Sequence, residues 1–445
     1  MSISTTRLGW TLAALVLAAE WCPWGGAMAA QSEAEQAKAI LEACGFKGGL
    51  VVHVGCGDGR LTAALRATPR TVVHGLDADV TAARRSIRAA GLYGPVSVER
   101  WSGGPLPYVD NLVRLLVASG NGQRLSRKEM LRVLCPGGVA MVAGSKIVKP
   151  WPSEIDEWPQ HFHGADNNAV ARDSVVGPPR HYQWIAEPQW GRSHLALPSM
   201  NSMVSAGGRL FTIEDQASAE HPALPGKFAL ICRDAFNGVM LWSRRFPDWQ
   251  PINIYVKFTP AQLQRQLAAI GETVYCTPGL DAPITALDAA TGAVLKEYPG
   301  TERTQEFAYD KGVLFVVMGD PFDTAGIGVT RGTIGPSAFP VRAYGPEIPK
   351  LADPKSTIAA IDAESGRTLW RKSGDDTRAY QGTSLAVRGP HAVYCTADSL
   401  ICLDRNSGAE RWRVPVGVSL GGAKAGAKRG ITGRPGMTVA VMLSD

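Results

Sequence analysis

The chain has 445 residues, 45% of them hydrophobic, and a formal net charge of +6 at pH 7. This length suits two or three domains, and the hydrophobic fraction is that of a globular protein with a sizeable core. The charge is small for the length and comes without a long run of lysine and arginine, so the composition shows no footprint of nucleic-acid binding.

Residues 1–30 have the pattern of a secretory signal peptide. Arg7 precedes the apolar run Leu8–Ala19, and Ala27-Met28-Ala29-Ala30 offers a cleavage site. An uncleaved membrane anchor is the alternative, but the apolar run is shorter than the ~20 residues that a helical span needs. We therefore expect a periplasmic or secreted protein with no transmembrane span after signal removal.

An apolar run then leads into three glycines at Val51–Arg60, VVHVGCGDGR, with a helical pattern at Leu61–Leu65. A buried strand, a glycine turn and a helix start make a nucleotide cradle, because glycine lets the backbone approach the ligand closely. Val72–Asp77 is a second predicted strand. It ends in Asp77, which follows Gly59 by 18 residues (77 − 59), where a carboxylate can accept both ribose hydroxyls.

Strand and helix patterns continue to alternate up to Val142. Ser126 and Glu129 form a capping box, and Pro136-Gly137-Gly138 is expected to turn the chain into the last strand. This order requires a mostly parallel sheet, so we predict an α/β Rossmann-like domain at residues 31–149. The predicted elements are helices at Thr81–Ala90 and Ser126–Leu134 and strands at Val96–Val98, Leu112–Ala118 and Val139–Val142.

Four segments of this region, VHVGCGDG, GLDAD, PLPYVDNLVRLLVA and LRVLCPGGVAMV, resemble the class I S-adenosylmethionine-dependent methyltransferases in order and spacing. The resemblance implies S-adenosylmethionine as the cofactor. It places Gly55, Gly57 and Gly59 against the methionine part and Asp77 on the ribose, and Asp58 joins them as a candidate cofactor-binding residue.

Two stretches depart from the family pattern. Where relatives carry an acid near the adenine, this chain has Trp101-Ser102-Gly103-Gly104, and where they have an acid on the fourth strand it has Arg114-Leu115-Leu116-Val117. The sequence identifies no general base and no group that holds a methyl acceptor, so the catalytic residues are unknown. A nucleotide-type fold kept as a scaffold is the alternative.

Residues 150–200 form a junction rich in Trp, Pro, His and Asn. His161 and His163 stand as H-x-H, which on a strand puts both imidazoles on one face and offers two ligands of a metal site. The alternative is a polar clasp between domains. No third ligand is in place, so we expect no metal site and keep the two histidines as candidates only.

Four copies of the pattern Asp-x-x-[Asn/Thr/Ser]-Gly-x-x-x-Trp recur between residues 201 and 416, with Lys296 in place of the Trp in the second copy. Each predicts a strand, a tight turn with glycine at positive φ and a returning strand. The copies are Arg233–Trp242, Leu287–Gly292, Ile361–Trp370 and Leu403–Trp412.

These copies resemble the pyrroloquinoline-quinone-type β-propeller repeats of quinoprotein dehydrogenases and of the propeller subunit of the outer-membrane barrel-assembly machinery. The resemblance implies an all-β propeller of about four blades, either truncated or left open, in which Asp and Gly form turns and Trp packs between blades. The quinone is not expected, because the adjacent cysteine pair of the dehydrogenases is absent. Gly319–Pro354 is a predicted surface loop, and residues 417–445 are a basic, Gly-rich tail.

Three functions fit this order of parts, which resembles a group of exported bacterial proteins. The first is an exported binding or scaffold protein whose propeller face holds a protein partner or a small molecule. The second is a working S-adenosylmethionine-dependent methyltransferase whose propeller selects the acceptor. The third is a quinone-dependent dehydrogenase, which requires the quinone to bind the propeller.

Overall fold

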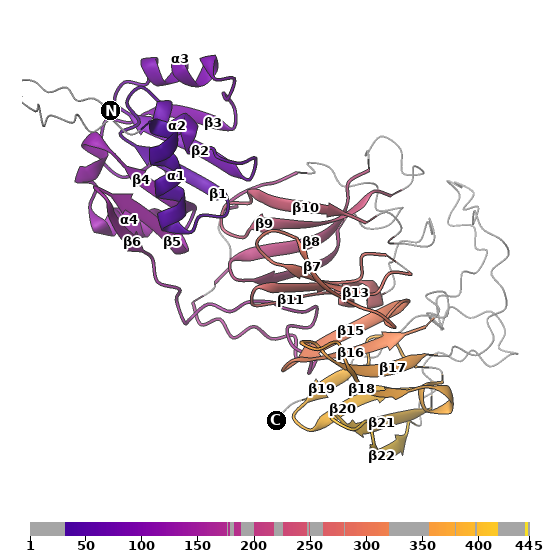
Figure 1. Ribbon diagram of the computed structural model, residues 1–445. Coiled ribbons are helices and arrows are strands. Elements are labelled where there is room, and N and C mark those ends of the chain that lie inside the picture. The colour runs from indigo at the N-terminus through magenta and orange to yellow at the C-terminus, as the bar shows by residue number, and fades with distance from the viewer. Residues whose placement is uncertain are drawn as a thin grey trace, which may run out of the picture.

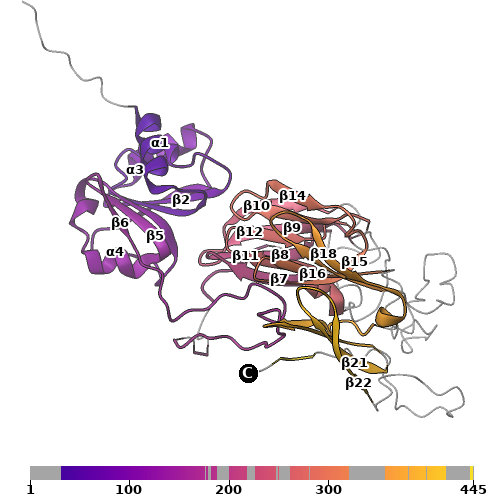
Figure 2. The same ribbon diagram turned by 60° about the horizontal axis from the view of Figure 1, so that its bottom comes forward.

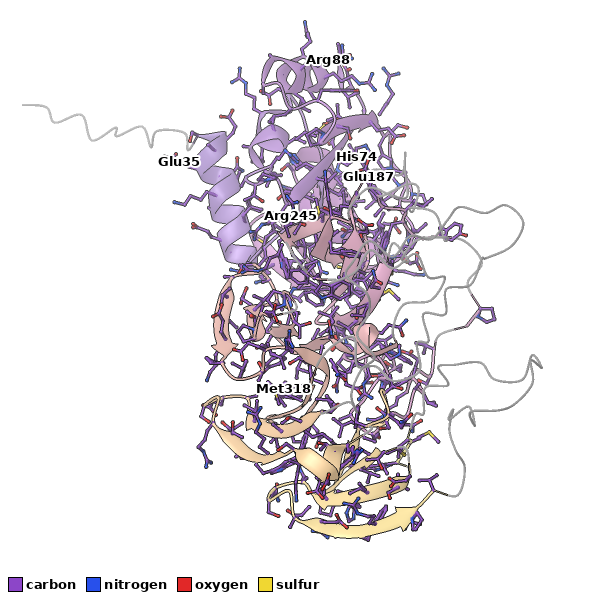
Figure 3. All side chains as sticks on the ribbon, turned by 90° about the vertical axis from the view of Figure 1, so that its right-hand side faces the viewer. Glu35, His74, Arg88, Glu187, Arg245 and Met318 are labelled. Atoms are coloured by element: carbon purple, nitrogen blue, oxygen red, sulfur yellow. The ribbon has the colours of Figure 1, made fainter. Side chains whose placement is uncertain are left out.

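The structure is a computed structural model that describes residues 32–175, 177–178, 182–187, 200–217, 226–246, 249, 261–279, 281–319, 356–378, 380–396, 398–416 and 441–443. The predicted signal peptide, the predicted loop after Gly319 and most of the Gly-rich tail lie outside these residues. An α/β domain occupies one end of the molecule, and four sheets follow one another away from it (Figure 1). In Figure 3, Glu35 and Arg88 mark the α/β domain and Met318 marks the third of these sheets.

The α/β domain is built on a six-stranded sheet with the order β3-β2-β1-β4-β5-β6, which confirms the Rossmann-like prediction. The first five strands of this order are parallel, and β6 runs antiparallel to β5. Its strands are β1 Gly49–Val54, β2 Thr71–Asp77, β3 Val96–Arg100, β4 Val113–Ala118, β5 Leu134–Val142 and β6 Ser145–Val148. Its helices are α1 Glu33–Cys44, α2 Arg60–Ala64, α3 Thr81–Ala89, α4 Arg127–Val133 and the 3₁₀ helix η1 Gly120–Arg124.

Alternation along β1 divides the core of this domain between the two faces of the sheet. Val51 packs with residues of α1 and α3, whereas its neighbour Val52 packs with residues of α4. Successive side chains of a strand point to opposite faces, so a strand at the centre of the sheet must be apolar at both. Both valines are fully buried, as are Leu115 and Leu116 on β4.

The predicted capping box at α4 is present at its first half, since the Ser126 hydroxyl accepts a hydrogen bond from the Glu129 backbone N–H. The predicted turn at Pro136-Gly137-Gly138 is wrong, because these residues lie inside β5. The pairing of β5 with β4 shifts register here, and a Cβ on Gly138 would lie 2.9 Å from the Val113 carbonyl oxygen. Glycine therefore serves a bulge with close backbone contact instead of a turn.

Each of the four further sheets is antiparallel and has four strands in sequence order, which confirms the all-β, propeller-like prediction. The first strands of successive sheets contact each other, and the first and last sheets lie at opposite ends of the row (Figures 1 and 2). The first two sheets contain β7 Met200–Ala206, β8 Arg209–Asp215, β9 Phe228–Asp234 and β10 Met240–Arg245, then β11 Leu267–Ile270, β12 Thr273–Cys276, β13 Ile284–Asp288 and β14 Val294–Tyr298. The last two contain β15 Thr304–Asp310, β16 Val313–Met318, β17 Thr357–Asp362 and β18 Thr368–Lys372, then β19 Ala386–Arg388, β20 His391–Cys395, β21 Ser399–Asp404 and β22 Glu410–Pro415.

All four repeat copies form the predicted hairpin between the last two strands of a sheet. The glycines have φ values of 72°, 73°, 80° and 68° at Gly238, Gly292, Gly366 and Gly408, as the turn requires. In each turn the Asp carboxylate accepts hydrogen bonds from backbone N–H groups two or three residues further on. The repeated Asp and Gly therefore hold the turns.

Candidate functional site

A cavity of about 630 Å³ opens at the carboxyl ends of β1, β2 and β3, beside η1. All of its lining residues lie between positions 55 and 129. Ligands of open α/β sheets bind outside the carboxyl ends of the strands, so this is the expected place for a cofactor. The lining includes Gly55, Asp77, Trp101, Gly104, Asn121 and Glu129.

The glycine turn after β1 is shaped by packing on one side and open on the other. Gly55 has a φ of 79°, and a Cβ there would lie 2.1 Å from the Ser119 carbonyl oxygen. Gly57 has a φ of 53°, and a Cβ there would meet nothing within 4 Å. Gly55 is thus required by the chain that crosses it, whereas Gly57 is exposed and faces open space.

Asp77 ties the end of β2 to this turn. One carboxylate oxygen accepts a hydrogen bond from the Gly57 backbone N–H at 2.9 Å, and the other accepts from the Ala78 N–H at 2.7 Å. Each carboxylate oxygen has a second lone pair, so the group can still accept hydrogen bonds from a ligand.

The other charged groups of the cavity are already engaged or exposed. Glu129 accepts hydrogen bonds from Arg132 and from the Leu106 N–H, and the bond from Arg132 is the main cause that lowers the pKa of this carboxyl. Arg124 is exposed. Among the described residues the lining contains no His, Cys, Tyr or Lys, so Asp77 and Glu129 are its candidate bases, and both carboxylates already accept hydrogen bonds from the domain.

His53 stabilises the turn from behind. Its Nδ1 lies 2.8 Å from the Thr62 hydroxyl on α2, and its Nε2 lies 3.0 Å from the Ser119 hydroxyl after β4. Burial lowers the pKa of His53 to about 4, although the negative charge of Asp77 acts to raise it. The neutral imidazole therefore links β1, α2 and the start of η1.

The first propeller-like sheet contacts the α/β sheet at the amino ends of its strands, opposite the cavity. The Arg114 guanidinium at the start of β4 pairs with the Asp234 carboxylate at 2.7 Å, and Asp234 is 1% exposed. Arg114 also lies over the Phe236 ring at 5.7 Å, and the Asn237 amide donates to the Leu112 carbonyl. The departure from an acid on the fourth strand thus has a structural reason, because the arginine joins the domains.

The junction runs across the first strands of the sheets. Its backbone and side chains bond to each sheet in turn, from Trp158 at the first to Ala165 at the fourth. This agrees with a polar clasp between domains. The junction therefore runs along the row of four sheets. The contacts are Ser205 N–H to Trp158 O, Ala269 N–H to Pro159 O, Tyr309 N–H to Gln160 Oε1 and Val387 N–H to Ala165 O.

The two candidate histidines lie in a turn, where the H-x-H geometry of a strand does not apply. His163 Nε2 pairs with the Asp156 carboxylate at 2.7 Å. Burial, followed by the charge of Arg265, lowers the pKa of His161 to about 4. The charged groups that act on the two histidines, Asp156 and Arg265, are of opposite sign. Within the described ranges, no group of three His, Cys, Asp or Glu side chains is arranged to hold a metal ion.

Comparison with known proteins gives a match for each part of the chain. Residues 354–442 match the family model described as outer membrane protein assembly factor BamB. No match was found among curated protein sequences. The matched residues include β17 and β18 of the third antiparallel sheet and the whole of the fourth.

Similar solved structures include a SAM-dependent methyltransferase from Aquifex aeolicus, 22% identical over 25% of this chain and 64% of that chain, with a TM-score of 0.21. The [4+2]-cyclase SpnF is 25% identical over 28% of this chain and 49% of its own, with a TM-score of 0.22. A quinohemoprotein alcohol dehydrogenase from Comamonas testosteroni is 13% identical over 58% and 41%, with a TM-score of 0.32. The chain spans about half the length of the solved structures that it matches.

In the α/β domain, Gly55 and Asp77 line the cavity, whereas Gly57, Asp58 and Gly59 belong to the same turn without lining it. The Asp58 carboxylate accepts from the Arg60 N–H at the start of α2. Trp101 lines the cavity and donates its indole N–H to the Pro105 carbonyl. In the sequence Trp101 marked only a departure from the family pattern. No sequence signal identified His53.

No helix among the described residues is long and apolar enough to cross a membrane.

Proposed function

We propose that this protein is an exported binding and scaffold protein: the propeller repeats hold a partner, and the methyltransferase-like domain binds an adenosyl ligand of the S-adenosylmethionine type. The observation that carries the scaffold proposal is the placement of the two parts. The cavity lies at the carboxyl edge of the α/β sheet and the first repeat sheet docks at the amino edge, through Arg114 and Asp234.

The distance between these edges argues against a propeller that presents an acceptor to the same cavity. The six residues of β1 run from Gly49, where a Cβ would meet the Asp234 carboxylate, to the turn at Gly55. At ~3.3 Å per residue the strand separates the two by about 20 Å. Reacting atoms must approach to ~3–3.5 Å, so a group held on the first sheet lies out of reach.

The cavity itself suits an adenosyl ligand. The Asp77 carboxylate can accept ribose hydroxyls, and the Trp101 indole offers an apolar face to a purine. When bound, S-adenosylmethionine supplies an electrophilic methyl group. Both carboxylates of the described lining, Asp77 and Glu129, already accept hydrogen bonds from the domain, which favours ligand binding without methyl transfer.

Calorimetric titration of residues 31–445 with S-adenosylmethionine tests the ligand. We expect micromolar binding that weakens at least about tenfold in Asp77→Asn, because an amide accepts ribose hydroxyls less well than a carboxylate. Asp79→Asn is the matched control, since Asp79 bonds to Thr81 and does not line the cavity. No heat in a folded protein contradicts the ligand and leaves the scaffold part standing.

A working methyltransferase is the second candidate. The position of Asp77 in the cavity lining favours it, because its carboxylate can accept hydrogen bonds from a bound cofactor. It requires an acceptor that enters the cavity from solvent without help from the first sheet. Incubation with methyl-labelled S-adenosylmethionine separates the two candidates, since label on a partner or small molecule contradicts the scaffold proposal.

Export is the third part of the proposal. The pattern of residues 1–30 supports it, as does the match of residues 354–442 to a family named for an outer-membrane assembly factor. An exported protein is separated from cytoplasmic S-adenosylmethionine, so the ligand would have to be met outside the cytoplasm or be a related adenosyl compound. Expression in a bacterium followed by fractionation and N-terminal sequencing tests this. A chain that keeps residues 1–30 in the cytoplasm contradicts it.

A further inference from the structure

A second cavity, of about 810 Å³, lies between the α/β domain, the first antiparallel sheet and the junction. This interdomain cavity is lined from the starts of β1 and β2, from residues 183–187 of the junction and from the repeat turn between β9 and β10. Figure 3 labels Glu187 in this region, where the α/β domain meets the first sheet. The volume is within the ~300–1,000 Å³ typical of sites for small ligands, and the lining shares no residue with the cavity at the carboxyl ends of the strands.

Arg233 brings a buried positive charge to the wall of the interdomain cavity. The residue is 8% exposed, and its guanidinium donates hydrogen bonds to the Glu187 carbonyl at 2.7 Å and to the Gly238 carbonyl at 3.3 Å. Carbonyl groups accept these hydrogen bonds but carry no charge that balances the cation, and further N–H groups of the guanidinium remain for a ligand. No carboxylate of the described residues lies within 4 Å of Arg233.

The other buried arginines show that this arrangement is unusual for the molecule. A buried cation is costly unless an opposite charge balances it, and the fold meets this requirement elsewhere. In the described part of the chain, each of the other two buried arginines pairs with a carboxylate, Arg265 with Glu306 and Arg405 with Asp310. Arg233 is the exception among the three.

The repeat pattern gives independent evidence that a cation is unexpected at this position. Arg233 precedes the turn Asp of the first copy, where the other three copies carry Leu287, Ile361 and Leu403. Each of these apolar residues belongs to the core between its own sheet and the preceding one. The first sheet has the interdomain cavity on that side. The chain therefore directs a cation into the cavity from a position where the repeat otherwise buries an aliphatic side chain.

The remainder of the interdomain cavity is mostly apolar. Its described lining has one further charged side chain, the exposed Glu187. A ligand that fits therefore brings a single negative charge to Arg233 and an apolar body to the walls. The apolar lining residues include Leu50, Val72, Leu112, Ile185, Val239 and Met240.

Trp184 and Gln183 hold the junction side of the cavity in place. The Trp184 indole N–H donates to the Ala235 carbonyl at 2.9 Å, and a Cβ on Gly238 would lie 2.4 Å from the indole ring. The Gln183 amide donates to the Asn111 carbonyl of the α/β domain and to a carbonyl of the repeat turn. Because this wall is bonded to both neighbours, the cavity is formed before any ligand binds.

We propose that the interdomain cavity binds a small organic carboxylate with an apolar body, of the type of a medium-chain fatty acid. The planar guanidinium of Arg233 matches a carboxylate, and charge-assisted hydrogen bonds to it supply the missing counterion. A singly charged head is favoured, because Glu187 repels a second negative charge. The site lies at the amino ends of β1 and β2, so it goes beyond the proposed function and does not rest on the adenosyl ligand.

Calorimetric titration of the full chain with octanoate tests this site. We expect binding that weakens at least about tenfold in Arg233→Leu, because the leucine removes the charge-assisted hydrogen bonds. Two other copies of the repeat carry leucine at this position, so the variant is compatible with the hairpin. Arg245→Leu is the matched control, since Arg245 is an exposed arginine of the same sheet that does not line the cavity (Figure 3). Octan-1-ol, which has the same chain without the charge, should bind the parent and Arg233→Leu alike.

Ile185 provides a second pair of variants that keeps the test independent of folding. It lines the cavity and is 83% exposed, so its substitution leaves the core unchanged. Ile185→Glu should weaken octanoate binding and Ile185→Lys should not, because the two side chains differ in the sign of their charge. Equal binding by these two variants contradicts the proposal.

Four further results overturn it. They are no heat with octanoate, equal octanoate binding by the parent and a folded Arg233→Leu, tighter binding of octyl phosphate than of octanoate, and octanoate binding that appears only in Glu187→Gln, which would make Glu187 the counterion of Arg233. Competition between octanoate and S-adenosylmethionine also contradicts the proposal, because it places octanoate in the other cavity. A chain that binds octanoate but not S-adenosylmethionine leaves this inference standing, so the two proposals fail separately.

Discussion

At the scale of single residues, His53 gives the clearest dependence on pH. Burial holds its pKa at about 4, below the 6.5 of an exposed histidine, so the unfolded chain binds the proton more readily than the folded one. The stabilisation is complete above pH 6.5 and is lost as the pH falls towards 4. The free energy of unfolding should drop by about 2 kcal/mol between pH 7.5 and 5 from this residue alone. Urea unfolding at the two pH values measures it.

His53→Asn is the informative variant for this prediction. Asparagine can keep the bond to Thr62 and cannot take up a proton, so its cost should be larger at pH 7.5 than at pH 5. His161, whose pKa is also lowered by burial, remains in both proteins and cancels in the comparison. An equal loss of stability at both pH values would show that His53 does not titrate between them.

Arg114 and Asp234 carry the second prediction at this scale. Arg114→Met leaves the Asp234 carboxylate buried without its cation, which should cost about 3–5 kcal/mol of stability. Asp234→Asn added to it removes the stranded charge and should restore part of the loss. A double-mutant cycle in urea separates these terms. Simple additivity of the two changes would mean that the pair contributes little to the domain junction.

At the scale of elements, the sequence predicted what depends on local chemistry. The four hairpins follow from Asp and Gly inside each turn, and the start of α4 follows from Ser126 and Glu129. The Pro-Gly-Gly prediction failed because the course of β5 is decided by its pairing with β4, which lies far away in the sequence. The role of Trp184 was equally hidden, since its partner is a turn some 50 residues downstream and its own surroundings do not match the repeat.

The candidate site divides in the same way. The glycine turn and Asp77 stand out in the sequence because they are close together in a known pattern. Trp101 lines the cavity, and His53 supports the glycine turn from behind. Both depend on strands and loops that only the folded sheet brings together. In the sequence, Arg114 is only a departure from the family pattern. Its role is visible in the fold, where its guanidinium pairs with Asp234.

The contact between a repeat Trp and the next turn gives a prediction with an internal control. Trp242→Ala removes a buried indole and its hydrogen bond to Ala289, and should cost about 3–5 kcal/mol. Trp412→Ala changes an exposed side chain of the same motif and should stay within about 0.5 kcal/mol. Thermal unfolding of the two variants beside the parent chain measures both. Equal losses would mean that Trp412 is buried in solution.

At the scale of the whole molecule, the row of sheets begins on one edge of the α/β domain and leads away from it (Figure 2). The first turn is filled from the junction, and the last repeat Trp is left exposed. Among the described residues, the row therefore runs from the α/β domain at one end to the exposed strand β22 at the other. A ligand in the cavity is separated from β22 by the full row of sheets.

This separation predicts independence of the two parts. Hydrogen exchange of the full chain with and without S-adenosylmethionine should show added protection near the cavity, at residues 55–60, 76–80, 101–106 and 119–126, because a bound ligand orders the backbone that surrounds it. Residues 200–416 should exchange at unchanged rates, since no described residue of the four antiparallel sheets lines the cavity. Protection that spreads into β9 and β10 would show that the Arg114–Asp234 pair transmits ligand binding to the repeats. The catalytic alternative, with acceptor selection by the propeller, would then regain its physical basis.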